Sequence, residues 1–323
     1  MIDTSYASTA APAASDPHVA GRRRPPKSRP RRSRLQRKSR RVALLFFLPA
    51  IAVNLLVIGG PAVSSIGYSF TDWNGISPPN FVGLDNWQRM LTDAAFWSVM
   101  RNNAIYLVVL VIIPTSLGLF GAFLLARIRR GSTVFRAIFF IPFLLISVVV
   151  AQIWRNLLSP DTGIAAALDS IGITWLNDVY FLGSQELALP TVIGVHVWSF
   201  IGFTMVFFYA AIKTVDPALI EAARLDGVGV WGEFWHVVIP GIRPMIVFSI
   251  SFAVIAGLLV YDMPRILTGG GPAGASDVAA LLINRTSIVG REAGYGTVLA
   301  LTLTLISGVV IGVITYLRRK EEN

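Results

Sequence analysis

The chain has 323 residues, of which 54% are apolar, 14% are charged and none is cysteine, and its mean hydropathy is +0.63. Soluble domains carry about 25% charged residues, so this composition argues against a water-soluble enzyme. The lack of cysteine excludes disulfide frameworks and thiolate metal sites. The net charge of +10 comes from residues 1–41, which hold 12 of the 28 Lys and Arg residues and two acids, whereas the other 282 residues are neutral.

Residues 1–41 include a stretch, residues 22–41, that is rich in Arg and Pro and almost free of apolar side chains. A segment of this composition cannot bury a core, so it is predicted to be a disordered cytoplasmic tail. A basic run directly before a first membrane helix is typical of a topology anchor that rests on anionic lipid. A nucleic-acid-binding arm is the less favoured alternative, and we expect no nucleic-acid partner.

Six apolar segments follow the tail, and each is long enough as a helix to cross a bilayer core of about 30 Å. They cover residues 43–70, 102–126, 134–157, 189–212, 244–263 and 296–317. The first begins too far along the chain, and is too long, for a cleavable signal peptide. The sequence therefore predicts an all-α, polytopic membrane protein with six transmembrane helices.

The distribution of Lys and Arg orients these spans, because cytoplasmic loops are enriched in positive charge. With the N-terminus in the cytoplasm, the inner segments hold 22 Lys and Arg residues and the outer segments hold 6. The bias remains 10 against 6 without the tail. We therefore predict that both termini are cytoplasmic, that residues 42–318 form the six-helix membrane domain and that residues 319–323 are a cytoplasmic end.

Patterns for nucleotide hydrolysis and metal binding are missing from the sequence. None of the four lysines follows a glycine-rich phosphate-binding turn, and the three histidines are scattered. Asp262 is the one acid placed within a predicted span, and Arg136 and Arg155 lie near the ends of the third span, where long side chains reach the interface. We expect no catalytic residue, no metal and no cofactor bound by this chain, which leaves a pathway or a scaffold.

The loop between the fourth and fifth spans has the pattern of a helical hairpin. Pro217 marks the first turn of a helix, and Glu221 and Arg224 are spaced to pair on one face. Gly227 interrupts this helix. A second short helix is expected to end at Pro240, because proline has no N–H to continue it.

The second helix of this hairpin carries Trp231, Phe234, Trp235 and Val238 at helical spacing. No soluble domain in the sequence covers these side chains, and an exposed apolar patch of this kind marks a partner surface. The alternative is a surface helix that lies on its own bundle.

The loop reads Glu-Ala-Ala, three residues, Gly, nine residues, an aliphatic residue, one residue, an aliphatic residue and Pro. This pattern resembles the EAA coupling loop of ABC importer permeases, here within residues 216–241. Residues 69–73, 81–87 and 267–272 resemble segments of the carbohydrate-uptake subgroup, which includes maltose, trehalose and glycerol-3-phosphate types. Two departures are modest: Ile239-Pro240 replaces the usual Leu-Pro, and Gly227-Val228 replaces the usual Gly-Ala. The resemblance assigns ATPase coupling to Glu221, Ala222, Ala223, Arg224, Asp226, Gly227 and Pro240.

The resemblance implies a type I ABC importer permease fold and one membrane half of a sugar importer, for a disaccharide or an oligosaccharide. It implies a second homologous permease subunit, two cytoplasmic ABC ATPase subunits that bind ATP and Mg, an extracytoplasmic sugar-binding protein and surrounding membrane lipids. The chain itself would be no enzyme, and its location would be a bacterial or archaeal cytoplasmic membrane. ATP binding would shift the bundle between two states through contacts at the loop.

Maltose-type permeases hold sugar between aromatic and polar residues on their last helices. By position, the candidates here are Trp198, Phe200, Phe203, Tyr261 and Asp262, of which only Trp198 matches in residue type. Aromatic packing or interfacial anchoring is the alternative for each residue taken singly.

An ATP-independent secondary transporter or channel is the alternative function. Such proteins tend to show inverted repeats and an ion site at the midplane, and the sequence shows neither. A membrane scaffold without transport is a third alternative, and it leaves the EAA pattern unexplained.

Overall fold

A computed structural model describes residues 47–128 and 130–321, with the side chains of residues 317–321 left out. The chain divides into two compact units, residues 1–58 and residues 59–323. The described part of the first unit, residues 47–58, is helical and its side chains are exposed. The predicted disordered tail, residues 1–41, lies outside the described residues.

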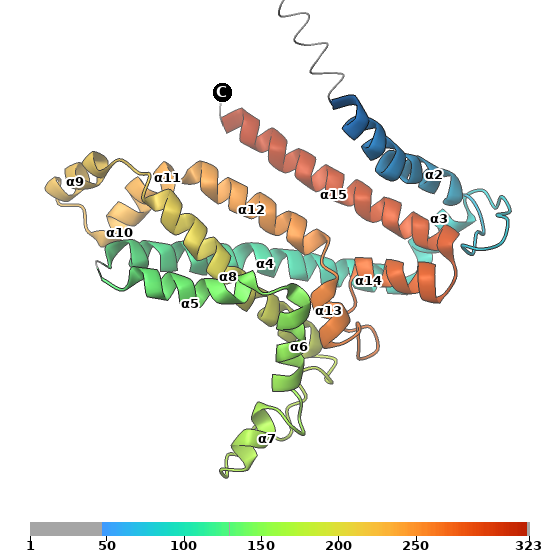
Figure 1. Ribbon diagram of the computed structural model, residues 1–323, viewed down its shortest axis with the longest axis horizontal. Helices are drawn as coiled ribbons and strands as arrows, with labels where there is room; N and C mark the ends of the chain where they lie inside the picture. The colour runs from blue at the N-terminus through green and yellow to red at the C-terminus, as the bar shows by residue number, and fades with distance from the viewer. Residues whose placement is uncertain (1–46, 129, 322–323) are drawn as a thin grey trace, which may run out of the picture. The chain divides into compact units, whose positions relative to one another are not determined.

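The second unit is built from helices, which carry the same labels in Figure 1. They are α2 (Gly60–Tyr68), α3 (Asp85–Thr92), α4 (Ala94–Arg127), α5 (Ser132–Leu144), α6 (Ser147–Leu157), α7 (Ile164–Asp169), α8 (Ala188–Ile212), α9 (Pro217–Leu225), α10 (Val230–Glu233), α11 (Ile239–Gly241), α12 (Arg243–Leu258), α13 (Asp262–Leu267), α14 (Ala279–Asn284) and α15 (Ala293–Glu321). Two π-helical turns accompany them, η2 (Phe234–Val238) and η3 (Arg285–Val289), and a third, η1 (Leu55–Gly59), lies almost wholly in the first unit. Extended pairing within the described residues is limited to an isolated bridge between Thr71 and Phe81, so the predicted all-α class is confirmed.

Four helices among the described residues are long and apolar enough to cross a membrane: Phe47–Tyr68, Ala94–Arg127, Ala188–Ile212 and Ala293–Tyr316. They correspond to the first, second, fourth and sixth predicted spans. Two further helix pairs pass the same test only when each bent pair is taken as one span, which brings the number to as many as six. The chain is therefore a multi-pass membrane protein.

The third predicted span, residues 134–157, is not one straight helix. It is divided into α5 and α6, whose axes differ by 95°. Leu145 and Ile146 are extended at the break, with ψ angles of 141° and 136°. Beyond the break α6 packs against α13, whereas α5 packs along α8. The apolar run did not predict this break, because local hydrophobicity carries no record of these two partners.

The fifth predicted span, residues 244–263, ends earlier than expected and begins at a bend. α12 ends at Leu258, and Tyr261 and Asp262 lie at the start of α13. Pro240 does not end the preceding helix, which runs through it to Gly241 and then bends by 73° into α12. Pro240 closely follows the π-helical turn η2, and the bend into α12 comes just after it, as is usual for a proline within a helix.

The centre of the second unit is the pair α4 and α8, which run in the same direction. Contacts between Tyr106 and His196, then Pro114 and Thr204, and finally Ala126 and Lys213 follow both helices from end to end. The hydroxyl of Thr204 donates to the carbonyl of Pro114 at 2.8 Å. This bond meets a helical backbone group that lipid could not satisfy.

Close approach between helices depends on glycine at two positions of this centre. A Cβ atom on Gly118 of α4 would lie 2.1 Å from Oγ1 of Thr204, and one on Gly202 of α8 would lie 1.7 Å from the carbonyl oxygen of Phe139. Small residues let membrane helices pack backbone against backbone. Gly118 and Gly202 therefore fix α4, α8 and α5 against one another, and this packing positions the hairpin described next.

Candidate functional site

The helical hairpin predicted within residues 216–241 is present. The side chain of Asp216 accepts a hydrogen bond from the backbone N–H of Ala218 at 2.9 Å, and Pro217 occupies the first turn of α9. These are the usual N-cap and first-turn residues of a helix. α9 ends before Gly227, whose φ of +76° favours glycine over any other residue. α10 and η2 then continue to α11.

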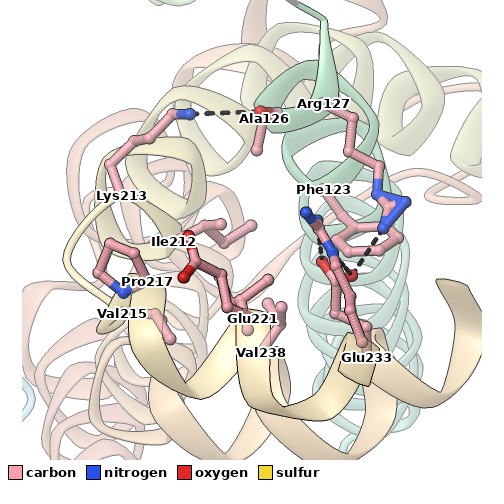
Figure 2. A pocket seen from close by; sticks show the side chains of 12 residues that line it. Phe123, Ala126, Arg127, Ile212, Lys213, Val215, Pro217, Glu221, Glu233 and Val238 are labelled. Carbon is pink, nitrogen blue, oxygen red and sulfur yellow. Dashed lines mark hydrogen bonds and ion pairs between the residues drawn. The ribbon is translucent and has the colours of Figure 1, made fainter. Parts of the chain in front are cut away.

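Glu233 of α10 holds the hairpin to the end of α4 (Figure 2). Its side chain is 5% exposed, and its carboxylate accepts a hydrogen bond from Nη2 of Arg127 at 2.8 Å. Arg224 of α9 donates to the same carboxylate from Nε at 3.0 Å and from Nη2 at 3.3 Å. Burial alone would raise the pKa of the Glu233 carboxyl, but the bonds from Arg224 and Arg127 hold it below its usual range.

The expected pair between Glu221 and Arg224 does not form. Both guanidinium bonds of Arg224 go to Glu233, and Glu221 is exposed. A buried carboxylate is destabilised without a charged partner far more than an exposed one is. Arg224 therefore pairs with the buried Glu233 and not with Glu221, the partner that local spacing predicted.

A cavity of about 550 Å³ lies between the hairpin and the ends of α4 and α8 (Figure 2). Its charged lining is formed by Arg127, Lys213, Glu221, Arg224 and Glu233. Lys213 also donates to the carbonyl of Ala126 at 3.2 Å. The ends of α4, α8, α9 and α10 therefore meet in one polar network beside this cavity.

The outer face of the hairpin is apolar and unusually exposed. Leu219 and Leu225 of α9 are 59% and 88% exposed, and Trp231 and Trp235 are each 60% exposed. Beneath them, Phe234 is buried and packs on Phe123 of α4 with ring centroids 4.7 Å apart. Of the other residues assigned to coupling, Ala222, Asp226 and Pro240 are exposed and Ala223 is half-buried.

The five residues assigned to a substrate pathway fall into three places. Trp198 is 44% exposed and meets Trp154 edge to face at 5.3 Å. Phe200 and Phe203 belong to an aromatic cluster with Phe143 and Phe252, in which Phe200 is buried. Tyr261 is half-buried against the core, and Asp262 is exposed beside it. The assignment of these residues to a pathway stays a prediction.

Two polar features escaped sequence reasoning. Glu233 and Arg127 are 106 positions apart, so no local spacing relates them. Tyr106 of α4 and His196 of α8 lie in apolar helices, and the Tyr106 hydroxyl is 2.9 Å from Nδ1 of His196. Each residue was visible only as an isolated polar side chain in an apolar run.

Comparison with known proteins places this geometry in a family. Residues 116–322 match the family described as "binding-protein-dependent transport system inner membrane component". The chain belongs to this family. The matched segment contains α8, the hairpin and every helix that follows it.

Several relatives of this inner membrane component are similar over most of both chains. A probable starch degradation products transport system permease of Thermoanaerobacterium thermosulfurigenes is 31% identical over 86% of this chain and 94% of its own. A diacetylchitobiose uptake system permease of Streptomyces coelicolor is 30% identical over 90% and 86%. A probable ABC transporter permease of Pyrococcus horikoshii is 30% identical over 83% and 92%.

A solved structure also shares the fold of the inner membrane component. A chain of a bacterial ABC transporter involved in the import of alginate superposes with a TM-score of 0.76. It is 23% identical, and the match covers 89% of this chain and 99% of that one. The likeness establishes the fold of an ABC importer permease.

Proposed function

We propose that this chain is the sugar-translocating membrane subunit of an ABC importer in a bacterial or archaeal cytoplasmic membrane. The observation that carries the proposal is the hairpin, which presents exposed Leu and Trp side chains while a buried carboxylate ties it to the longest span. A partner on that face can move α9, and the buried network passes the movement to α4. The sugar is proposed from the relatives, whose names refer to starch degradation products and diacetylchitobiose.

The proposed assembly contains a second homologous permease subunit, two cytoplasmic ATPase subunits that bind ATP and Mg, and an extracytoplasmic sugar-binding protein. Its support is the family description, which states dependence on a binding protein. We propose six spans with both termini in the cytoplasm, in which the bent pair α5 and α6 counts as one span and α12 forms the fifth. In this orientation the hairpin lies on the ATPase side, and the distribution of positive charge supports it.

Uptake of labelled saccharides by cells that lack this chain, with and without its restoration, tests the proposal. We expect one class of disaccharide or oligosaccharide to depend on the chain and on ATP. Uptake that continues after ATP is depleted would instead support a secondary transporter or channel. A soluble ATPase that copurifies with the chain is the second expected result.

Alanine variants of Trp198, Phe203 and Tyr261 test the pathway in the same cells. A pathway residue should lower uptake or alter the sugar preference without loss of assembly. A packing residue should lower yield and thermal stability instead, and unchanged uptake in all three variants would remove them from the pathway.

A further inference from the structure

A second cavity, of about 660 Å³, lies between α4 and α8 at the opposite end from the hairpin. Two aliphatic rows line it, each with a residue every fourth position. The row on α4 is Ile105, Val109 and Ile113, and the row on α8 is Leu189, Ile193 and Val197. Residues four apart lie on one face of a helix, so two parallel helices form a groove with aliphatic walls. No aromatic side chain lines this groove, which makes it unlike a sugar site.

One end of the groove is polar. Arg101, Asn102, Gln185 and Glu186 line it there, one turn or less before the aliphatic rows begin. Each row runs over nine residues, which is about 12 Å along the helix, and one leaflet of a bilayer core is about 15 Å thick. The aliphatic part of the groove is therefore about as long as one leaflet is thick. The polar end then lies at the level of the lipid headgroups.

The charged side chains at the polar end of the groove have no partner among the residues that the structure describes. Arg101 and Glu186 are exposed, and neither side chain forms a hydrogen bond or an ion pair with any residue that the structure describes. A guanidinium binds phosphate through paired N–H groups, and a free carboxylate accepts from an ammonium group. The two charges have opposite sign, so they complement a headgroup that carries both signs.

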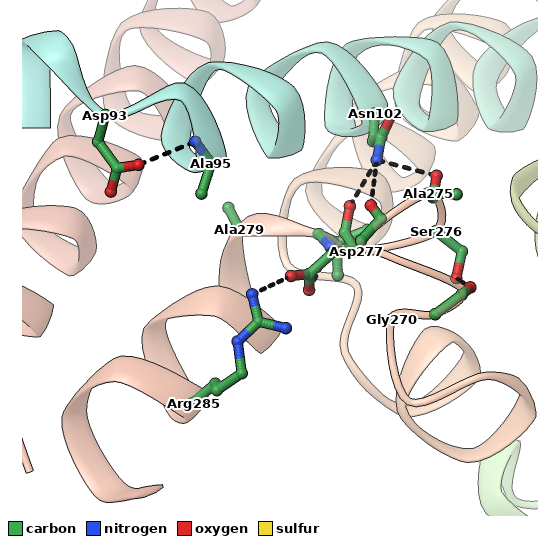
Figure 3. Close-up of polar contacts among 12 residues, drawn as sticks. Asp93, Ala95, Asn102, Gly270, Ala275, Ser276, Asp277, Ala279 and Arg285 are labelled. Carbon is green, nitrogen blue, oxygen red and sulfur yellow. Dashed lines mark hydrogen bonds and ion pairs between the residues drawn. The ribbon is translucent and has the colours of Figure 1, made fainter. Parts of the chain in front are cut away.

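Asn102 fixes the loop at the polar end of the groove against α4 (Figure 3). It is 1% exposed, and its Nδ2 donates to the carbonyls of Ala275 and Asp277 at 3.1 and 2.9 Å and, more weakly, of Gly274 at 3.4 Å. These bonds hold the loop in place where Gly274 and Ala275 line the groove.

We propose that this groove binds one glycerophospholipid whose headgroup carries a phosphate and a primary ammonium, as in phosphatidylethanolamine. The phosphate binds Arg101, the ammonium lies toward Glu186, and one acyl chain fills the space between the aliphatic rows. The site needs only a multi-pass chain in a bilayer, so it does not depend on which solute is transported.

Photocrosslinking in vesicles tests the site in the full complex. The probe is phosphatidylethanolamine with a diazirine on its acyl chain, present in trace amount in vesicles of phosphatidylethanolamine and phosphatidylglycerol. We expect crosslinks concentrated on residues 105–113 and 189–197, competed by unlabelled phosphatidylethanolamine and less well by phosphatidylcholine, which has no N–H donor. R101Q should lower this labelling about tenfold, because a charge-assisted hydrogen bond is lost. R155Q is the matched control, since Arg155 is also exposed and lines no part of this cavity.

A second pair of variants separates occupancy of the groove from general contact with lipid. I105W fills the groove and should remove the labelling at residues 189–197, whereas L117W on an exposed, lipid-accessible part of the same helix should leave it unchanged. Labelling spread evenly over the spans, or equal in R101Q and R155Q, would show surrounding lipid only and overturn the proposal. Labelling of residues 105–113 and 189–197 in the isolated chain but not in the full complex would also overturn it, because another subunit would then cover the groove.

Discussion

Replacement of Glu233 by Gln tests whether the buried network holds the hairpin to α4. The carboxylate accepts bonds from Arg127 and Arg224, and an amide would present a donor to side chains that only donate. Breaking a fully buried pair costs about 3–5 kcal/mol. Here Arg127 and Arg224 keep 29% and 55% of their side-chain exposure, so water recovers part of the loss, and we expect a cost of about 2 kcal/mol.

Hydrogen exchange in the purified chain measures this cost directly. A cost of about 2 kcal/mol predicts that backbone amides of α9 and α10 exchange about 30-fold faster in E233Q, while the middle of α4 is unchanged. E221Q is the matched control, because Glu221 is an exposed carboxylate of the same hairpin and accepts no hydrogen bond from a residue that the structure describes. Equal protection in E233Q and E221Q would refute the reasoning, since the buried pairs would then contribute nothing to the hairpin.

Four further outcomes are expected. G227V should leave the chain inserted but abolish stimulation of the ATPase by the binding protein. Gly227 has a φ of +76°, where a β-branched residue is strained by about 1–2 kcal/mol, and normal stimulation and uptake would refute this expectation. G202A should lower thermal stability of the complex, since its Cβ would overlap the Phe139 carbonyl, whereas G194A enters open space and should not. The pKa of Glu233 is lowered in the folded protein, so its contribution to stability is complete above about pH 4.5 and is lost as the pH falls through the folded pKa. Tryptophan fluorescence of the hairpin should report this loss. Deletion of residues 1–30 should leave assembly and uptake intact, and lost uptake with normal assembly would assign the tail a role.

Local patterns were enough to predict the hairpin. Pro217 and Gly227 act on the backbone within a few residues, so their effects can be read without knowledge of the fold. The choice of partner for Arg224 could not be read in this way, because it depends on the burial of Glu233 against a helix about 100 residues earlier. The same holds for the break after Leu144, which is fixed by packing of α6 on α13.

The predicted span boundaries show the same limit. The apolar run of residues 102–126 lies inside α4, but the helix begins eight residues earlier. Its first turns carry polar residues such as Ser98 and Arg101, and hydropathy excludes them from a span. Asn102, the first residue of the predicted span, is buried, and loop carbonyls accept from its Nδ2.

The length of α4 has a mechanical consequence. Its 34 residues make a rod of about 51 Å, roughly 20 Å longer than a bilayer core. A helix of this length extends beyond the bilayer core. Its rotation by about 10° displaces one end relative to the other by about 9 Å. Arg127 sits at one end, so a displacement of that end by a partner on the hairpin would be matched by an opposite displacement of similar size at the other end.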